Sequence, residues 1–266
     1  MKLSNRGNGV ASLAVKGVSK RFGGLVALDH ASVELDSGRI TGLIGPNGAG
    51  KTTLYNVMTG FLPADGGDVI YKGERVTNLA PVQLVHRGIC RSFQDLRLFL
   101  RLSVLDNVMA AISHQQGERL LSAIFGGRGQ ERQNRERAMM VLDKVGLAER
   151  ASDLAEDLGL GEQKVLCLAR VLATDADVML LDEPTANLDY HEMKRMFDLI
   201  NGLAAQGKTI CIVEHNVELI VNLCHYVYAL HLGRNSAEGT PQEIVKNPKV
   251  LSVYLGERGE GVPEWG

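Results

Sequence analysis

The feature of this sequence that most constrains its fold is a glycine-rich turn between an apolar run and a helix-like segment. The run ITGLIG at 40–45 has the length and β-branching of a buried strand, and it leads into GPNGAGKTT at 45–53. The next segment, TTLYNVMTGF, has the pattern of a helix. Parallel α/β sheets are built from strands that alternate with helices, so this succession predicts an α/β fold.

Three further apolar runs end abruptly in polar residues. ICRSF leads into Gln94, VMLL into Asp182 and Glu183, and TICIV into Glu214 and His215. Helix-like segments lie between and after these runs, which predicts a mainly parallel sheet covered on both faces. Because ligands bind at the carboxyl ends of the strands in such sheets, we expect these polar groups to converge on one site.

The turn at 45–53 has the chemistry of a phosphate loop. Its glycines allow successive backbone N–H groups to surround a phosphate, and the helix that follows directs its positive end at the same anion. Lys51 is expected to reach the β- and γ-phosphates, and the Thr52 hydroxyl to ligate Mg²⁺. The predicted nucleotide-binding residues are Gly45, Pro46, Asn47, Gly48, Ala49, Gly50, Lys51, Thr52 and Thr53.

The acidic pair after VMLL supplies the second part of a nucleotide triphosphate site. Asp182 is expected to hold magnesium through water, and Glu183 to act as the general base on the attacking water. An acidic pair also ends many strands for structural reasons. The upstream phosphate loop favours the catalytic interpretation.

Three other residues have both structural and functional interpretations. His215 is either a surface or capping residue or a contact to the γ-phosphate, and Gln94 is a candidate ligand of magnesium or of the attacking water. Phe22 lies some twenty residues before the loop and is either a core aromatic or a stacking partner for adenine. The predicted catalytic residues are Glu183, His215 and Gln94, and the predicted magnesium ligands are Thr52, Gln94 and Asp182.

The segment from about 95 to 165 lacks strand-like runs, which predicts a helical subdomain inserted into a nucleotide-binding core of about 10–94 and 166–256. Within it, the polar stretch GGRGQERQNRER at 126–137 is interpreted as a solvated loop or the start of a helix. The tail from Gly256 is expected to be frayed, with 257–266 flexible.

Composition limits the partners and the compartment. The net charge is −2 and only 5% of residues are aromatic, which argues against nucleic acid as a partner. The four cysteines lack CxxC spacing, which is typical of reduced thiols in a cytosolic protein. No apolar stretch approaches the ~18 residues of a membrane helix, and the N-terminus lacks the apolar core of a secretion signal, so we expect a soluble protein.

Taken in order, GPNGAGKTT, SFQ, a glycine turn before a helix, VMLLDEP, ANLD and VEHN resemble the ABC-type ATPase domain from Phe22 to about Glu257. RSFQDLRLF, the long insert at 113–137 and the ending EGTPQEIVKNPKVLSVYLGE are similar to the ATPase subunits of branched-chain amino acid importers. ATPases for urea-type amides or for lipid export look alike, so a lipid or lipopolysaccharide system is one alternative.

The resemblance implies a P-loop ATPase with an N-terminal antiparallel β part, the inserted helical subdomain, and ATP and Mg²⁺ as cofactors. It implies head-to-tail dimers in which one subunit's signature turn faces ATP on the other, with Asp189 of ANLD near the partner's site and Phe22 stacked on adenine. The implied partners are transmembrane permease subunits contacted through Gln94 and the helical subdomain, a second ATPase subunit, identical or different, and a solute-binding protein. The implied location is the cytoplasmic face of the cell membrane.

The signature position departs from the family pattern LSGGQ. It is occupied by LGLGE, which comprises Leu158, Gly159, Leu160, Gly161 and Glu162. The change removes a serine hydroxyl, adds a leucine side chain, and places a carboxylate that would repel phosphate unless a cation offsets it. Either backbone contacts suffice, or the turn makes a weak site and the chain belongs to a heterodimer with one strong and one weak site.

Two further function classes remain as alternatives. A soluble ABC ATPase that acts outside transport usually has two cassettes, coiled-coil arms or basic extensions, none of which the sequence shows. A regulatory subunit that binds nucleotide without hydrolysis is disfavoured by Glu183 and His215 but is compatible with the altered signature.

Overall fold

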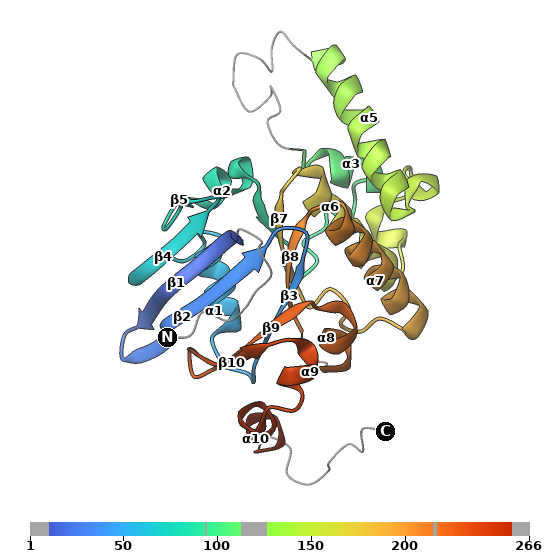
Figure 1. The fold of residues 1–266 in the computed structure, drawn as a ribbon. Coiled ribbons are helices and arrows are strands. Elements are labelled where there is room, and N and C mark those ends of the chain that lie inside the picture. The colour runs from blue at the N-terminus through green and yellow to red at the C-terminus, as the bar shows by residue number, and fades with distance from the viewer. Residues whose placement is uncertain (1–10, 94, 113–126, 215–216, 257–266) are drawn as a thin grey trace. The chain divides into compact units, whose positions relative to one another are not determined.

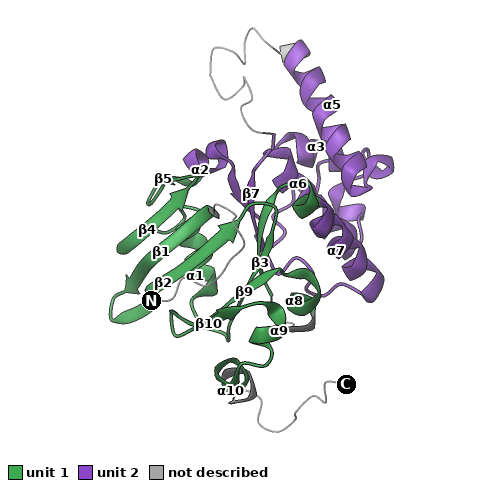
Figure 2. Cartoon of the chain, viewed as in Figure 1, with its two compact units in different colours: residues 1–81, 203–266 green, residues 82–202 purple. Residues whose placement is uncertain are grey.

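The structure is a computed structural model that describes residues 11–93, 95–112, 127–214 and 217–256 (Figure 1). The chain forms two compact units (Figure 2): residues 1–81 and 203–266 belong to unit 1, and residues 82–202 to unit 2. No helix formed by the described residues is long and apolar enough to cross a membrane.

One sheet of unit 1 is antiparallel. Its strands are β1 (Ala11–Phe22), β2 (Leu25–Asp36), β4 (Gly66–Tyr71) and β5 (Glu74–Arg75), in the order β2-β1-β4-β5 (Figure 1). Phe22 pairs with Leu25, so β1 and β2 are joined by the two residues Gly23 and Gly24. Gly23 has a φ of 57°, a conformation that two-residue hairpin loops require and glycine adopts freely.

The other strands of unit 1 surround β3 (Ile40–Ile44), the predicted strand before the phosphate loop. β3 is parallel to β8 (Thr209–Val213) on one side and to β9 (Tyr226–His231) on the other, and β10 (Arg234–Gly239) is antiparallel to β9. All five residues of both β3 and β8 are buried, which explains why these runs are mainly apolar and do not alternate between apolar and polar residues. The helices are α1 (Lys51–Met58), α8 (Val217–Leu223), α9 (Pro241–Ile244) and α10 (Pro248–Gly256).

Within its described residues, unit 2 contains two parallel strands, β6 (Ile89–Arg91) and β7 (Val178–Asp182), and is otherwise mainly helical. Its helices are α3 (Val104–Met109), α5 (Gly127–Val145) and α6 (Leu160–Ala173), with 3-10 turns η2 (Ala148–Arg150) and η3 (Ala155–Asp157) between α5 and α6. The unit begins within the short helix α2 (Pro81–Arg87) and ends within the helix α7 (Tyr190–Ala205).

The polar stretch at 126–137 is helical from residue 127 onward, where it forms the first half of α5. Asn134, Ala138, Leu142 and Val145 are buried at helical spacing, while most of the charged residues between them are exposed. Of the two interpretations of this stretch, the helix start is confirmed and the loop is wrong for 127–137. Residue 126, the insert at 113–126 and the tail at 257–266 lie outside the described residues.

Candidate functional site

In unit 1, the predicted phosphate loop has the strand–loop–helix setting that its chemistry requires. β3 ends at Ile44, and α1 begins at Lys51 immediately after Gly50, which caps the helix with a φ of 100°. A Cβ atom on Gly45 would lie 2.3 Å from the backbone oxygen of Leu230, so the loop passes too close to β9 for a side chain at that position. The first N–H groups of α1 therefore follow directly on the glycine loop.

The Lys51 side chain is buried against this loop. Its Nζ donates hydrogen bonds to the backbone oxygens of Gly45, at 2.6 Å, and Pro46, at 3.0 Å. The ammonium group is thus held over the concave turn, where an anion bound by the loop would meet it. Asn47 and Gly48 are exposed at the turn, Ala49 is buried, Thr52 is exposed and Thr53 is half-buried at the start of α1.

Phe22 is a surface aromatic rather than a core residue. It ends β1 with 45% of its area exposed, and the Nζ of Lys20 lies 5.7 Å from its ring centroid. Lys20 also donates a 2.8 Å hydrogen bond to Asp65, which lowers the pKa of that carboxyl together with the Arg21 backbone N–H. An exposed ring face at this position is available for stacking against a base.

In unit 2, the predicted acidic pair ends β7. Asp182 is buried, its Oδ2 accepts a 3.1 Å hydrogen bond from the guanidinium of Arg91, and its backbone N–H donates to Ser92 Oγ at 3.1 Å. The Arg91 side chain is only 6% exposed, so this is an ion pair shielded from water. Sequence reasoning missed Arg91, although it lies three residues before Gln94 in RSFQ.

Glu183 adopts a backbone conformation that is rare for a residue with a side chain. Its φ is 47°, in the left-handed region, and its backbone oxygen accepts a 3.0 Å hydrogen bond from Lys164 Nζ. Such strain is often retained at functional sites. A pocket in unit 2 is lined by Ser92, Phe93, Lys164, Cys167, Asp182 and Glu183 among others, so the acidic pair faces a recess. Gln94 and His215 lie outside the described residues, and their roles stay predictions.

The LGLGE turn leads directly into helix α6. Leu158 is buried, Gly159 precedes the helix with an ordinary extended conformation (φ −62°, ψ 161°), and Leu160 begins the helix with 43% of its area exposed. The Nε2 of Gln163 donates to the backbone oxygens of Leu158 and Ala155, at 3.1 and 3.2 Å. The turn is therefore fixed by side chains of the helix that follows it.

Gly161 is buried on the first turn of α6, where the side chain of Glu192 covers it. A Cβ atom there would lie 2.2 Å from Oε1 of Glu192, so that carboxylate rests against the glycine. Glu192 also accepts a 3.1 Å hydrogen bond from the Asp189 backbone, and Asp189 Oδ1 accepts one of 2.9 Å from the Glu192 backbone. The predicted partner-facing residue Asp189 thus caps α7, and Glu192 links that cap to the signature turn.

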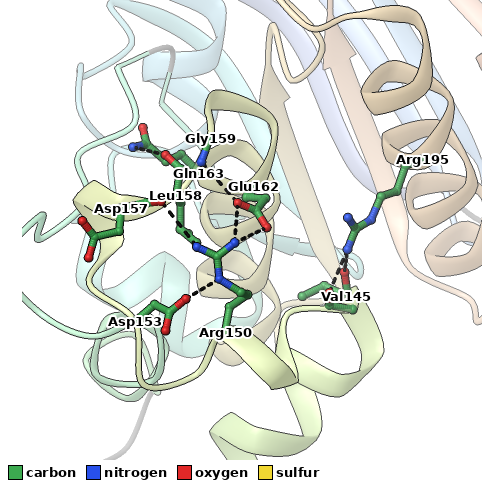
Figure 3. A network of polar contacts seen from close by, with 10 residues as sticks. Val145, Arg150, Asp153, Asp157, Leu158, Gly159, Glu162, Gln163 and Arg195 are labelled. Carbon is green, nitrogen blue, oxygen red and sulfur yellow. Dashed lines mark hydrogen bonds and ion pairs between the residues drawn. The ribbon is translucent and has the colours of Figure 1, made fainter.

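The carboxylate of Glu162 faces the turn and is neutralised by an arginine (Figure 3). Arg150 Nη1 donates to both of its oxygens, at 3.0 and 3.1 Å, and Glu162 Oε2 accepts the Gly159 N–H at 3.2 Å. The cation that was needed to offset Glu162 is therefore present in the described structure. Sequence reasoning missed Arg150, because the two residues are twelve positions apart and on different elements.

The comparison with known proteins agrees with this geometry. A family model described as "ABC transporter" matches residues 28–186, which is more than half of the chain. The chain belongs to the ABC transporter family. A second model, "Branched-chain amino acid ATP-binding cassette transporter", matches residues 237–260.

Among curated members of the ABC family, the chain is similar to the high-affinity branched-chain amino acid transport ATP-binding protein LivG of Salmonella typhimurium. The two are 38% identical over 253 residues, which cover 92% of this chain and 98% of LivG. The corresponding protein BraF of Pseudomonas aeruginosa is 34% identical over 249 residues, covering 92% and 98%.

Solved ABC structures confirm the predicted fold class. A nucleotide-free ATP-binding cassette from an ABC transporter is 32% identical, with a TM-score of 0.83 over 94% of this chain and 100% of that one. A cassette in its ADP conformation is 31% identical, with a TM-score of 0.81 over 93% of this chain and 99% of that one. The α/β P-loop cassette with its antiparallel sheet is thus the fold of this chain.

Proposed function

We propose that this chain binds and hydrolyses ATP as the motor subunit of an importer for branched-chain amino acids. The observation that carries the ATP site is the strand–glycine loop–helix unit, in which Lys51 is buried against the loop that it follows. The substrate class is supported by the match at 237–260 and by the relatives LivG and BraF.

In the proposed mechanism, the loop at 45–50 and the first N–H groups of α1 surround the β-phosphate, and the Lys51 ammonium moves from the loop oxygens to the phosphates. The Glu183 carboxylate accepts a proton from water while the water oxygen bonds to the γ-phosphorus and the bond to the β–γ bridging oxygen breaks. Phe22 stacks on adenine. Gln94 and His215 are assigned to the attacking water and the γ-phosphate.

The residues assigned to magnesium fit that ion. Thr52 offers an exposed hydroxyl at the start of α1 and Asp182 a carboxylate at the end of β7, and Mg²⁺ prefers such hard oxygen ligands with water and phosphate completing its shell. When bound, the ion would neutralise charge on the phosphates. The buried Arg91 holds one Asp182 oxygen in a fixed orientation.

We further propose that two cassettes associate head to tail, so that LGLGE and Asp189 of one approach ATP on the other. The proposed partners are transmembrane permease subunits, a second ATPase subunit and a solute-binding protein, and the proposed location is the cytoplasmic face of the membrane. The transport role within this arrangement is supported by the names of the relatives, which are transport ATP-binding proteins.

The ATP site is tested by equilibrium binding of ATP to the purified chain and to its Lys51→Met variant. Loss of a charged hydrogen-bonding group should lower the affinity about 10- to 100-fold. Lys194→Met, at an exposed position of α7, is the matched control and should leave the affinity unchanged. Equal affinities of Lys51→Met and wild type would refute the assignment of the phosphate loop.

The transport role is tested in vesicles that contain the chain with its permease and partner ATPase subunits. Uptake of leucine should require ATP and should be lost with Glu183→Gln. ATP turnover without uptake of any branched-chain amino acid would contradict the substrate class while leaving the ATPase intact. Light scattering on purified Glu183→Gln with ATP then distinguishes a homodimer, which should form, from a heterodimer, for which the chain should stay monomeric.

A further inference from the structure

The segment that carries the signature turn is strongly acidic and contains a single cation. Residues 148–163 include five carboxylates, Glu149, Asp153, Glu156, Asp157 and Glu162, and one basic residue, Arg150. The next cation, Lys164, donates to the backbone oxygen of Glu183. A turn in this setting would repel a phosphate unless the charge nearest to it were neutralised.

Arg150 connects the three parts of this segment (Figure 3). Its Nη1 binds both oxygens of Glu162 on α6, its Nε donates to Asp153, and its Nη2 donates to the backbone oxygen of Asp157 in η3 at 3.4 Å. The two-oxygen contact with Glu162 is the planar geometry that favours arginine over lysine. Both side chains are partly shielded, with 36% of Arg150 and 29% of Glu162 exposed.

The Glu162 side chain has a structural role in the turn, because it accepts a hydrogen bond from the Gly159 N–H. A serine before a helix would accept a hydrogen bond from the third residue of the helix, but Gly159 has no side chain, so only the reciprocal bond from its own N–H to Glu162 is formed. The carboxylate thus closes the turn, yet it lies at the positive end of α6, which a phosphate would also occupy.

We infer that Arg150 is a positioning residue for ATP hydrolysis, which neutralises Glu162 and holds it as the cap of α6 so that the start of this helix, at the exposed Leu160, can receive the γ-phosphate of the other cassette. This inference rests on the proposed function and deepens it. It explains how a turn with a glutamate at its fifth position supports a phosphate contact. The ligand class is a nucleotide triphosphate bound on a second cassette.

The test is a double-mutant cycle in the assembled transporter. Arg150→Met should lower ATP turnover at least about tenfold, because an uncompensated carboxylate then faces the phosphate. In a Glu162→Gln background, where the amide oxygen still accepts the Gly159 N–H, the same Arg150→Met change should cost less than about twofold. The matched control is Arg75→Met, which removes an exposed arginine of β5 that pairs with Asp68 on β4, and which should leave turnover unchanged.

If the turnover defect of Arg150→Met is electrostatic, it should also depend on the salt concentration. Raising the salt concentration from about 0.1 M to about 1 M shortens the screening length from about 10 Å to about 3 Å, so the defect of Arg150→Met relative to wild type at the same salt should shrink. A merely structural defect should be insensitive to salt or grow with it. ATP binding by the variant's own Lys51 site should be unaffected.

The outcomes separate this inference from the proposed function. If wild type turns over ATP and Arg150→Met is either as active or not rescued by Glu162→Gln, the inference alone is refuted. If Arg150→Met fails to fold and the double variant fails as well, Arg150 is a structural residue and the inference is again refuted. If the wild-type complex neither binds nor hydrolyses ATP, both proposals fall together.

Discussion

At the scale of single residues, Gly159 has the backbone of an ordinary helix cap, so its lack of a side chain is not forced by geometry. Its φ of −62° suits any residue, and the nearest atom to an added Cβ is Glu162 Oε2 at 4.0 Å. Gly159→Ser should therefore fold normally, with stability changed by only a few tenths of a kcal/mol.

The functional effect of Gly159→Ser separates the two interpretations of LGLGE. If the turn makes a weak site, the new hydroxyl should add a charge-assisted hydrogen bond and raise turnover of the assembled complex about tenfold or more. Steady-state phosphate release measures this directly. Unchanged turnover would show that backbone contacts already suffice.

The buried pair of Arg91 and Asp182 is another residue-scale feature. Arg91→Met removes a guanidinium group that lies over the Phe93 ring and pairs with a carboxylate that is 8% exposed, so it should lower the free energy of unfolding by about 3 kcal/mol. Urea denaturation measures the loss. Adding Asp182→Asn should recover part of it, since the amide carries no charge; a loss well below 1 kcal/mol would mean that the pair contributes little.

At the scale of elements, helix α3 fixes the loop before it through one side chain. Asn107 is fully buried; its Oδ1 accepts the Phe99 N–H at 2.9 Å, and its Nδ2 donates to the oxygens of Phe99 and Ser103, each at 3.0 Å. The loop that it holds exposes Phe99, Leu100 and Leu102.

Asn107→Ala should accordingly destabilise the chain by about 2 kcal/mol, because it removes three hydrogen bonds from a fully buried side chain and takes away the acceptor of the Phe99 N–H. Thermal or urea unfolding measures the change. Asn201→Ala, at an exposed position of α7, is the control and should stay within about 0.5 kcal/mol of wild type. Equal stabilities of the two variants would contradict the role of Asn107.

Elements differed in how well the sequence predicted them. β3, β7 and β8 were found because short, mainly apolar runs that end abruptly in polar or glycine residues have few alternatives in a buried sheet. The start of α5 was left ambiguous because its first half is polar on nearly every face. The sequence analysis did not predict strands β9 and β10. They pair with each other in a hairpin, and that pairing leaves no pattern of its own in the sequence.

The candidate site shows the same division. The phosphate loop and the acidic pair are local motifs, so their settings were predictable, whereas Arg91, Arg150 and Glu192 act on residues far away in the sequence. Charge balance is a signal that could have pointed to Arg150, because it is the one cation among residues 148–163. Such contacts depend on tertiary packing, which no window of sequence records.

At the scale of the whole molecule, three of the four cysteines, Cys90, Cys167 and Cys224, should be unreactive. Burial raises the pKa of Cys167 to about 11 and also raises those of Cys90 and Cys224, so their thiolates form only well above neutral pH. At pH 7.5, iodoacetamide should label Cys167 of the native chain on the order of a hundred times more slowly than Cys167 of the unfolded chain. Mass spectrometry after timed labelling provides the measurement, and rapid labelling of any of these three thiols in the native chain would contradict the expectation.

The glycines of the phosphate loop differ in whether a neighbouring strand leaves room for a side chain. A Cβ on Gly50 would lie 2.6 Å from the Ala27 oxygen, as one on Gly45 would approach Leu230, whereas a Cβ on Gly48 meets nothing within 4 Å. In a mutational scan, alanine at 45 or 50 would thus abolish nucleotide binding by distorting the loop's support, whatever the phosphate requires. Alanine at 48, with the modest strain of its φ of 76°, is the substitution whose effect reports on the ligand itself.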